Sequence, residues 1–458
     1  MTRPDPKTAD LEARDARVLW HPATHFRDLE SLAPIVVRGA EGCELLTPEG
    51  RRILDGISSW WTCLHGHGHP AIVEAIARQA AQLDHVMFAG FTHEPAIALA
   101  EALLEHAPRE SDGAPYYGKV FYSDCGSASI EVAMKLSFQS RVQRGETERR
   151  RFATLSNSYH GETLGALAAC GADDYRALFS PLLVDVLHLD APDHDAHRHE
   201  DLEARVGGDS PEADAACAAL EAHADELTAL LIEPIVQCAG RMVMPGSGFY
   251  RRVCETAQRL GIHVIADEIA VGFGRTGRLF ASEWAGVTPD LLCISKGLSG
   301  GVLPLAATLI RRGFEDDFKG SPSRSFMHSH TFTGNPIACA SGLASLRLLL
   351  DERLAELPRR IEMMTQGLRS VAEACPSIAE WRQSGLIGAL RVEASERAMP
   401  AGGRLGLALR RAALARDVLL RPLHDTIYWM PPLIAGRSEY DRLTEVTIEV
   451  VREVVESA

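Results

Sequence analysis

Residues 291–301 read Leu291-Leu292-Cys293-Ile294-Ser295-Lys296-Gly297-Leu298-Ser299-Gly300-Gly301: an apolar run, one lysine and a glycine-rich loop. The apolar run predicts a buried strand that delivers Lys296 at its C-terminal end. Parallel sheets place reactive groups at that edge, and a partly buried lysine loses much of its preference for the ammonium form. We therefore interpret Lys296 as a Schiff-base lysine. The alternative is a surface lysine that ends a strand.

Strands and helices alternate on both sides of this stretch. Further strands are predicted at 119–123, 152–155, 230–236, 262–266 and 305–310, with helices at 128–142, 164–170 and 248–260. Strands separated by helix-length segments predict an α/β fold with a mainly parallel sheet, helices on both faces and a site at the C-terminal edge.

The two ends of the chain have a different pattern. Residues 34–38, 43–47 and 52–55 predict a small antiparallel meander, followed by helices at 72–83 and 94–106. After Pro336 we expect helices at 338–350 and 357–374, short strands and a last helix near 440–454, which together indicate a smaller α+β unit.

Composition excludes several classes of protein. The net charge of −15 has no compensating basic stripe, which argues against a nucleic-acid partner. No apolar run approaches the roughly 20 residues that span a bilayer, and residues 1–15 are charged, so we expect a cytoplasmic protein that does not enter a membrane. The 10 cysteines include no Cys-x-x-Cys pair, which favours reduced thiols over disulfides or a zinc site.

Three predicted strand ends offer complementary groups to one rim of the sheet. Gly126 and Ser127 lie at a helix N-terminus, where backbone N–H groups can hold a phosphate, although an N-cap serine is the simpler interpretation. Asp267 ends an apolar strand, and a pyridinium nitrogen would pair its carboxylate. With the amine of Lys296, these are the three attachments that pyridoxal 5'-phosphate needs.

A competing motif follows Asp267 in the chain. Gly272-Phe273-Gly274-Arg275-Thr276-Gly277 matches the G-x-G-x-x-G dinucleotide pattern. Its context is wrong, because Asp267 and Glu268 would repel a pyrophosphate and residues 278–284 lack a strong helix. We interpret it as a loop beside the cofactor, with an NAD-binding protein as the alternative from another class.

Two histidine clusters raise the question of a metal. His65, His67 and His69 alternate with glycines, which suits a loop packed on a cofactor or a partner as well as a metal site, and no fourth ligand lies nearby in the sequence. His194, His197 and His199 lie in the charged segment 190–226, which we interpret as a solvated, variable insertion. We expect no metal.

Longer motifs carry a family resemblance. Residues 265–269, the glycine loop 272–277, Ser295-Lys296-Gly297 and residues 331–336 resemble the class III aminotransferases of fold type I. The resemblance implies a smaller α+β domain built from both ends of the chain. Its implied bounds are 1–60 for the N-terminal part, 61–335 for the large pyridoxal-phosphate domain and 336–458 for the C-terminal part.

The same resemblance implies roles for individual residues. Lys296 would carry the cofactor, Asp267 would face its ring nitrogen, Tyr159 would stack on its ring, and Gly126 with Ser127 would bind its phosphate. His330 and Thr331 would reach the phosphate of the neighbouring subunit, so the protein would be a homodimer with active sites at the interface. The implied substrate-binding residues are Trp60, Trp61, Ser329, Arg421 and Tyr428.

Further motifs resemble the branch of the family that acts in biotin biosynthesis, including Trp20-His21-Pro22, residues 55–61, residues 85–88, residues 159–163 and residues 428–432. The resemblance implies ping-pong transfer of the amino group of S-adenosylmethionine to 8-amino-7-oxononanoate. Ala23 and the pair Ser329-His330 depart from the usual pattern in the substrate region. Another class III transaminase, with lysine or an ω-amino acid as donor, is therefore the alternative.

Overall fold

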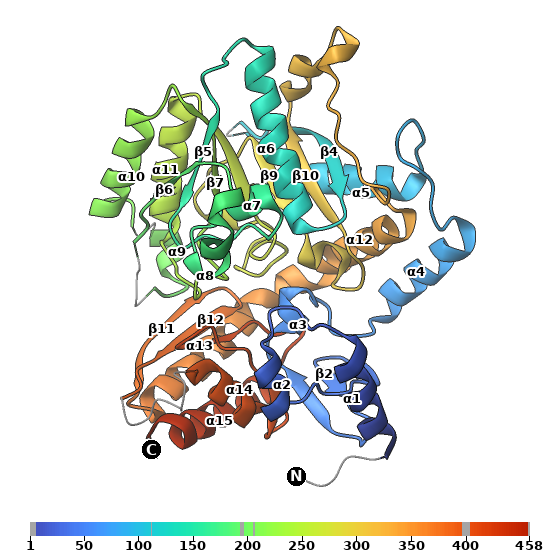
Figure 1. Ribbon diagram of the computed structural model, residues 1–458, viewed down its shortest axis with the longest axis vertical. Helices are drawn as coiled ribbons and strands as arrows, with labels where there is room; N and C mark the ends of the chain where they lie inside the picture. Colours follow the sequence, from blue (N-terminus) through green and yellow to red (C-terminus); the bar gives the residue numbers. More distant parts are fainter. Residues whose placement is uncertain (1–5, 111, 193–196, 205–206, 396–403, 457–458) are drawn as a thin grey trace.

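A computed structural model describes residues 6–110, 112–192, 197–204, 207–395 and 404–456. Its main element is a seven-stranded sheet with the order β4-β10-β9-β8-β7-β5-β6 (Figure 1). Only β10 runs antiparallel to its neighbours, which confirms the predicted mainly parallel α/β fold. The strands are β4 (Tyr117–Ser123), β5 (Arg151–Leu155), β6 (Val186–Leu189), β7 (Leu227–Ile232), β8 (His263–Asp267), β9 (Leu291–Ile294) and β10 (Ala306–Arg311).

Alternate residues of the central strands enter different cores, as the two-residue period of a strand requires. In β7, Ala229 and Leu231 pack with α6, whereas Leu230 and Ile232 pack with α10 and α11. Because both faces are covered, β7 is apolar at every position except Thr228, and none of its residues is exposed. The covering helices include α6 (Gly126–Gln143), α7 (Leu164–Ala168), α10 (Pro211–Ala222) and α11 (Ser247–Arg259).

Both ends of the chain build the smaller part, which lies below the main sheet in Figure 1. A four-stranded sheet has the order β1-β2-β3-β13, and β13 (Val418–Leu419) pairs in parallel with β3 (Arg52–Asp55). A three-stranded sheet follows the order β11-β12-β14. Its strands and those of the N-terminal meander are β1 (Gly39–Glu41), β2 (Glu44–Leu46), β11 (Ile378–Ser384), β12 (Ile387–Val392) and β14 (Thr426–Trp429).

Helices complete the smaller part and join it to the main sheet. α12 packs against both α4 and α5, and α13 packs against α15. The remaining α-helices are α1 (Pro6–Val18), α2 (Phe26–Ser31), α4 (Pro70–Gln82), α5 (Glu94–His106), α8 (Asp173–Arg176), α9 (Asp201–Ala204), α12 (Pro336–Leu348), α13 (Leu357–Ala374), α14 (Leu405–Leu414) and α15 (Arg437–Val451). The segment labelled α3 (Ser58–Trp61) is a left-handed turn.

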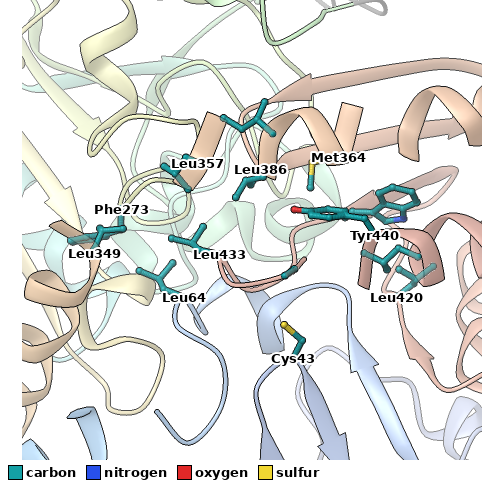
Figure 2. Packing of buried hydrophobic residues seen from close by; sticks show 14 of the residues in the cluster. Cys43, Leu64, Phe273, Leu349, Leu357, Met364, Leu386, Leu420, Leu433 and Tyr440 are labelled. Atoms are coloured by element: carbon teal, nitrogen blue, oxygen red, sulfur yellow. The ribbon is translucent and has the colours of Figure 1, made fainter. Parts of the chain in front are cut away.

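One hydrophobic core links the two parts (Figure 2). Cys43 and Leu64 of the N-terminal segment share it with Phe273 of the glycine loop and with Leu433 and Tyr440 near the C-terminus. All ten cysteines are free thiols, and nine of them are buried. In the described ranges, no helix combines the length and the apolar character that crossing a bilayer requires.

Two local predictions were wrong. Residues 34–38 contain no strand, and the first strand is β1, because Pro34 lacks a backbone donor and the chain pairs only from Arg38 onward. The segment 190–226 is not a solvated insertion throughout, since Ala213, Ala216 and Leu220 of α10 are buried in the core beside β7. The three acidic residues of α10, Glu212, Asp214 and Glu221, lie outside this apolar stripe, and with the charged residues before the helix they obscured it.

Candidate active site

The C-terminal ends of five strands supply one cavity of about 460 Å³. β4 leads to Gly126 and Ser127, and β5 leads to Tyr159 and His160. β7, β8 and β9 lead to Glu233, Asp267 and Lys296, all of which line the same cavity. This is the sheet edge at which parallel α/β folds place their ligands.

Lys296 is held in an unusual backbone conformation at the start of the short 3₁₀ turn η3 (Lys296–Ser299). Its φ is +38°, in the left-handed region that non-glycine residues rarely adopt. Lys296 is half-buried, and its Nζ lies 4.9 Å from the centre of the Trp61 ring. Burial lowers the pKa of Lys296, although Asp267, Cys238 and Glu233 oppose that shift. The lowered pKa increases the fraction of neutral, nucleophilic amine.

Asp267 is fixed from two directions. Its Oδ1 accepts the backbone N–H of Ile269 at 3.0 Å, and its Oδ2 accepts Nδ1–H of the fully buried His160 at 2.7 Å. Burial disfavours the charged imidazole, yet the Asp267 carboxylate outweighs burial and raises the pKa of His160 above its ordinary value. His160 Nε2 lies 3.1 Å from Thr154 Oγ1, which holds the ring in place. The buried Asp267 carboxylate is therefore held in one orientation by two hydrogen bonds.

A second buried carboxylate supports the same loop. Glu233 accepts the backbone N–H of Tyr159 at 3.0 Å and that of Cys238 at 3.1 Å. Burial raises the pKa of Glu233 to about 7, against the opposing effect of His160. His160 and Glu233 had no role in the sequence prediction. The sequence pattern that could have identified them is their position, because each follows shortly after an apolar strand that ends at the same sheet edge.

The phosphate end of the predicted site is the N-terminus of α6. This helix has 18 residues, and its N-cap, Cys125, has no side-chain cap hydrogen bond. Ser127 Oγ accepts the backbone N–H of Glu162 at 3.2 Å, which joins the helix to the loop after β5. Gly161, with φ +123°, makes this approach possible, because a Cβ there would lie 2.0 Å from Ser127 Oγ.

These residues fit pyridoxal 5'-phosphate by their chemistry. The cavity has an amine with a lowered pKa, a carboxyl group oriented by two hydrogen bonds and a helix N-terminus that favours an anion. The Tyr159 ring lines the same cavity, and its hydroxyl donates to Glu162 Oε1 at 3.0 Å. Each attachment that the cofactor needs has a candidate residue here.

The predicted substrate residues divide into two groups. Trp61 lines the cavity of Lys296, and its ring meets that of the buried Tyr428 at a centroid distance of 6.0 Å. Arg421 instead lines a neighbouring cavity of about 440 Å³ together with Ala23. The half-exposed Trp60 joins the two groups, because the Arg421 guanidinium lies 4.3 Å from the centre of its ring.

Ser329, His330 and Thr331 do not line the lysine cavity of their own chain. His330 Nδ1 lies 3.0 Å from Asp124 Oδ2, close to the N-terminus of α6. Their predicted role toward a second subunit stays a prediction.

The histidine clusters form no metal site within the described ranges, where no group of three suitable ligands occurs. His67 donates to Asp55, and His65 hydrogen-bonds with Ser345. His194 lies outside the described residues. His199 Nδ1 accepts the backbone N–H of Gly385 at 3.0 Å, and His197 is buried.

The glycine loop 272–277 packs into the protein core and does not line the lysine cavity, contrary to the prediction that it lies beside the cofactor. Phe273 and Arg275 are almost fully buried, and the Arg275 guanidinium donates to the carbonyls of Pro431 and Cys63. A Cβ on Gly274 would meet three leucine side chains, so its surroundings are apolar. The loop presents no phosphate cradle.

Comparison with known proteins agrees with this geometry. Residues 27–451 match the family model for "Aminotransferase class-III". The chain therefore belongs to the class III aminotransferases, a family of transaminases that depend on pyridoxal 5'-phosphate.

Several relatives share the name adenosylmethionine-8-amino-7-oxononanoate aminotransferase. The protein from Geobacter sulfurreducens is 38% identical over 96% of this chain and 97% of its own length. That from Synechococcus elongatus is 39% identical over 95% of this chain and 99% of its own.

Solved structures include two kinds of class III neighbour. The aminotransferase of that same name from Methanocaldococcus jannaschii has a TM-score of 0.89 at 28% identity, covering 97% of this chain and 99% of its own. An (S)-enantioselective omega-transaminase from Thermomicrobium roseum has a TM-score of 0.86 at 30% identity, covering 97% and 98%. Both match the fold closely, so the fold alone does not select the substrates.

Proposed function

We propose that this transaminase moves the amino group of S-adenosylmethionine to 8-amino-7-oxononanoate, giving 7,8-diaminononanoate for biotin biosynthesis. The observation that carries the proposal is the full-length similarity, at 38–39% identity, to relatives named for this reaction. The arrangement of Trp61 over Lys296 and of Arg421 on Trp60 supports it.

Pyridoxal 5'-phosphate would be held at three points. Lys296 would bind it covalently, Asp267 would face the ring nitrogen, and Gly126 with Ser127 would hold the phosphate at the N-terminus of α6, with Tyr159 stacked on the ring. When bound, this group supplies an electron sink for the carbon that carries the amino group.

Lys296 Nζ would move the proton of the reaction. Its lowered pKa increases the fraction of neutral amine, which could accept a proton from the substrate carbon and return it to the neighbouring position. His160 keeps Asp267 oriented through the 2.7 Å hydrogen bond. Tyr159 and Trp61 would exclude water from the two sides of the cavity.

Substrate recognition would use the second group of residues. Arg421 would bind the carboxylate of the keto acid, because a guanidinium pairs with a carboxylate through two hydrogen bonds. Trp60 and Trp61 would provide an apolar wall for an alkyl chain or a sulfonium donor. Tyr428 and Ser329 would complete the substrate site.

We also propose a homodimer in which His330 and Thr331 reach the cofactor phosphate of the neighbouring subunit. The large domain would comprise residues 61–335, and residues 1–60 and 336–458 would form the small domain. The parallel pairing of β3 with β13 supports a small domain built from both ends of the chain.

A donor panel tests the reaction. The purified enzyme with its cofactor bound is mixed with one amino donor at a time, without acceptor, and the visible band of the cofactor is followed through a single turnover. S-adenosylmethionine should bleach the band. The structural match to an omega-transaminase makes lysine or an ω-amino acid the second candidate donor, and bleaching by these donors alone would select it.

A further inference from the structure

Residues 58–61 form a left-handed turn, which is a costly conformation for side chains of this size. The φ angles of Ser58, Ser59, Trp60 and Trp61 are +51°, +46°, +73° and +75°. Left-handed helical backbone costs about 1–2 kcal/mol per non-glycine residue. Such a turn persists only where its surroundings fix it.

Asp55 is the group that fixes the turn from inside. Its carboxylate is completely buried, and its Oδ2 accepts Ser59 Oγ–H at 2.7 Å. Its Oδ1 accepts the backbone N–H of Ile57 at 3.3 Å. Burial alone would raise the pKa of Asp55, but the hydrogen bonds from His67 and Ser59 outweigh burial and hold it below its ordinary value.

His67 supplies the positive charge. Its Nε2–H donates to Asp55 Oδ2 at 3.0 Å, and this bond, above all, raises the pKa of His67 to about 10. The backbone of His67 is fixed independently, because its N–H and C=O pair with Gly42 at 2.7 and 3.2 Å. The glycines on either side, Gly66 and Gly68, both have positive φ, which explains their alternation with histidine.

The turn connects this ion pair to both substrate-facing tryptophans. Trp61 covers Lys296, and Trp60 covers Arg421. Asp55 also pairs in register with Leu419, which lies two residues before Arg421. The pairing of β3 with β13 therefore fixes the position of the Arg421 backbone relative to the turn. Gly301 packs closely against the end of the turn, because a Cβ there would lie 2.7 Å from the Thr62 backbone.

We propose that the Asp55–His67 ion pair is a positioning device for substrate recognition: it holds the left-handed turn that presents Trp60 to Arg421 and Trp61 to Lys296. Neither residue touches substrate. The inference rests on the proposed assignment of Trp60 and Arg421 to substrate binding, and it gives the Gly-His-Gly motif a role in specificity.

The test compares His67→Gln and Asp55→Asn with His69→Gln, a matched change two residues further along the same loop. Kinetic constants are measured per cofactor-loaded site, with the donor that bleaches the wild-type enzyme and the acceptor that the wild type uses. His67→Gln and Asp55→Asn should raise the acceptor KM about tenfold, the size of effect expected from one lost charged hydrogen bond. His69→Gln should leave it unchanged.

A double-mutant cycle separates positioning from simple stabilisation. In a Trp60→Ala background, His67→Gln should change the acceptor KM less than about twofold, because the side chain through which the pair acts on the acceptor-binding Arg421 is absent. If the two substitutions changed the acceptor KM independently, so that their fold-changes multiplied in the double variant, the proposal would be overturned. So would a lower melting temperature with unchanged KM and kcat per folded site.

Near-UV circular dichroism provides a readout without substrate or cofactor. The tryptophan signal of the unloaded protein should change in His67→Gln and stay constant in His69→Gln. An unchanged signal in His67→Gln would contradict the inference. Because this measurement does not depend on which donor or acceptor is used, it still tests the turn if the proposed reaction is wrong.

Discussion

At the scale of single residues, the site depends on Lys296. Lys296 is half-buried, its backbone is in the left-handed region, and its pKa is lowered. A lysine that only ended a strand would need neither the strain nor the burial. The structure therefore favours a reactive lysine over the surface alternative.

Replacing Lys296 by alanine should lower transaminase activity by about a thousandfold or more, because in the proposed mechanism this residue supplies both the covalent attachment and the proton transfer. The visible band of the bound cofactor should shift or disappear. Activity and absorption spectra of the purified variant check this. Lys319→Ala, at an exposed lysine paired with Asp316, is the control and should behave as wild type. An unchanged spectrum in Lys296→Ala would contradict the assignment.

Sequence reasoning located Lys296, Asp267 and Ser127 because each lies at the end of an apolar strand or the start of a helix. It could not assign His160, because the hydrogen bond to Asp267 joins residues 107 positions apart. Glu233 was missed for a related reason, since its two partners are backbone N–H groups that only the folded loop brings to it.

At the scale of elements, the loop after β5 and the start of α6 have to approach each other closely. Gly161→Ala should weaken cofactor binding by about tenfold or more, since a methyl group would collide with Ser127 Oγ and strain the backbone. Cofactor titration followed by fluorescence measures this. Gly145→Ala is the matched control, because Gly145 also has positive φ but open space around it. Equal losses in both variants would show that strain, and not the collision, is responsible.

The left-handed turn should have a signature in the pH dependence of stability. The folded pKa of His67, about 10, lies above its ordinary value of 6.5. Folded His67 thus keeps a proton that the unfolded chain has released, and its stabilising effect is full below pH 6.5 and declines as the pH rises through 10.

His67→Gln should therefore unfold more easily than wild type near pH 7, with a difference that shrinks toward pH 10. Urea unfolding at several pH values checks this, with His69→Gln as the control. A difference that stays constant across this pH range would mean that the charge of His67 does not contribute.

Elements were predicted well where apolar runs are buried on both faces, as in β8 and β9. Prediction failed at residues 34–38, where a β-rich run has no partner strand, and at α10, whose charges concealed a buried stripe. The turn at residues 58–61 could not be predicted, because no sequence rule favours four consecutive left-handed residues of which two are tryptophans.

At the scale of the whole molecule, the proposed dimer makes a specific prediction about mixed subunits. Lys296→Ala and Thr331→Asp should each inactivate the homodimer. If Thr331 acts on the partner's cofactor, a mixed dimer has one site with both defects and one intact site. Random exchange of subunits should then restore about a quarter of wild-type activity.

Subunit exchange under mild denaturation, followed by an activity assay, measures this recovery. Each variant exchanged with itself is the control and should stay inactive. If Thr331 acts within its own chain, every site in the mixed dimer carries one defect. Complete absence of recovery, with mixed dimers shown by mass spectrometry to be present, would contradict the shared site.

The identity of the amino donor and the acceptor can be established by analysing the product of the reaction. The enzyme with its cofactor bound is incubated with S-adenosylmethionine and 8-amino-7-oxononanoate, and the products are identified by mass spectrometry. We predict that 7,8-diaminononanoate forms and that its new amino nitrogen comes from labelled S-adenosylmethionine. Transfer of label from lysine or β-alanine, with none from S-adenosylmethionine, would contradict it.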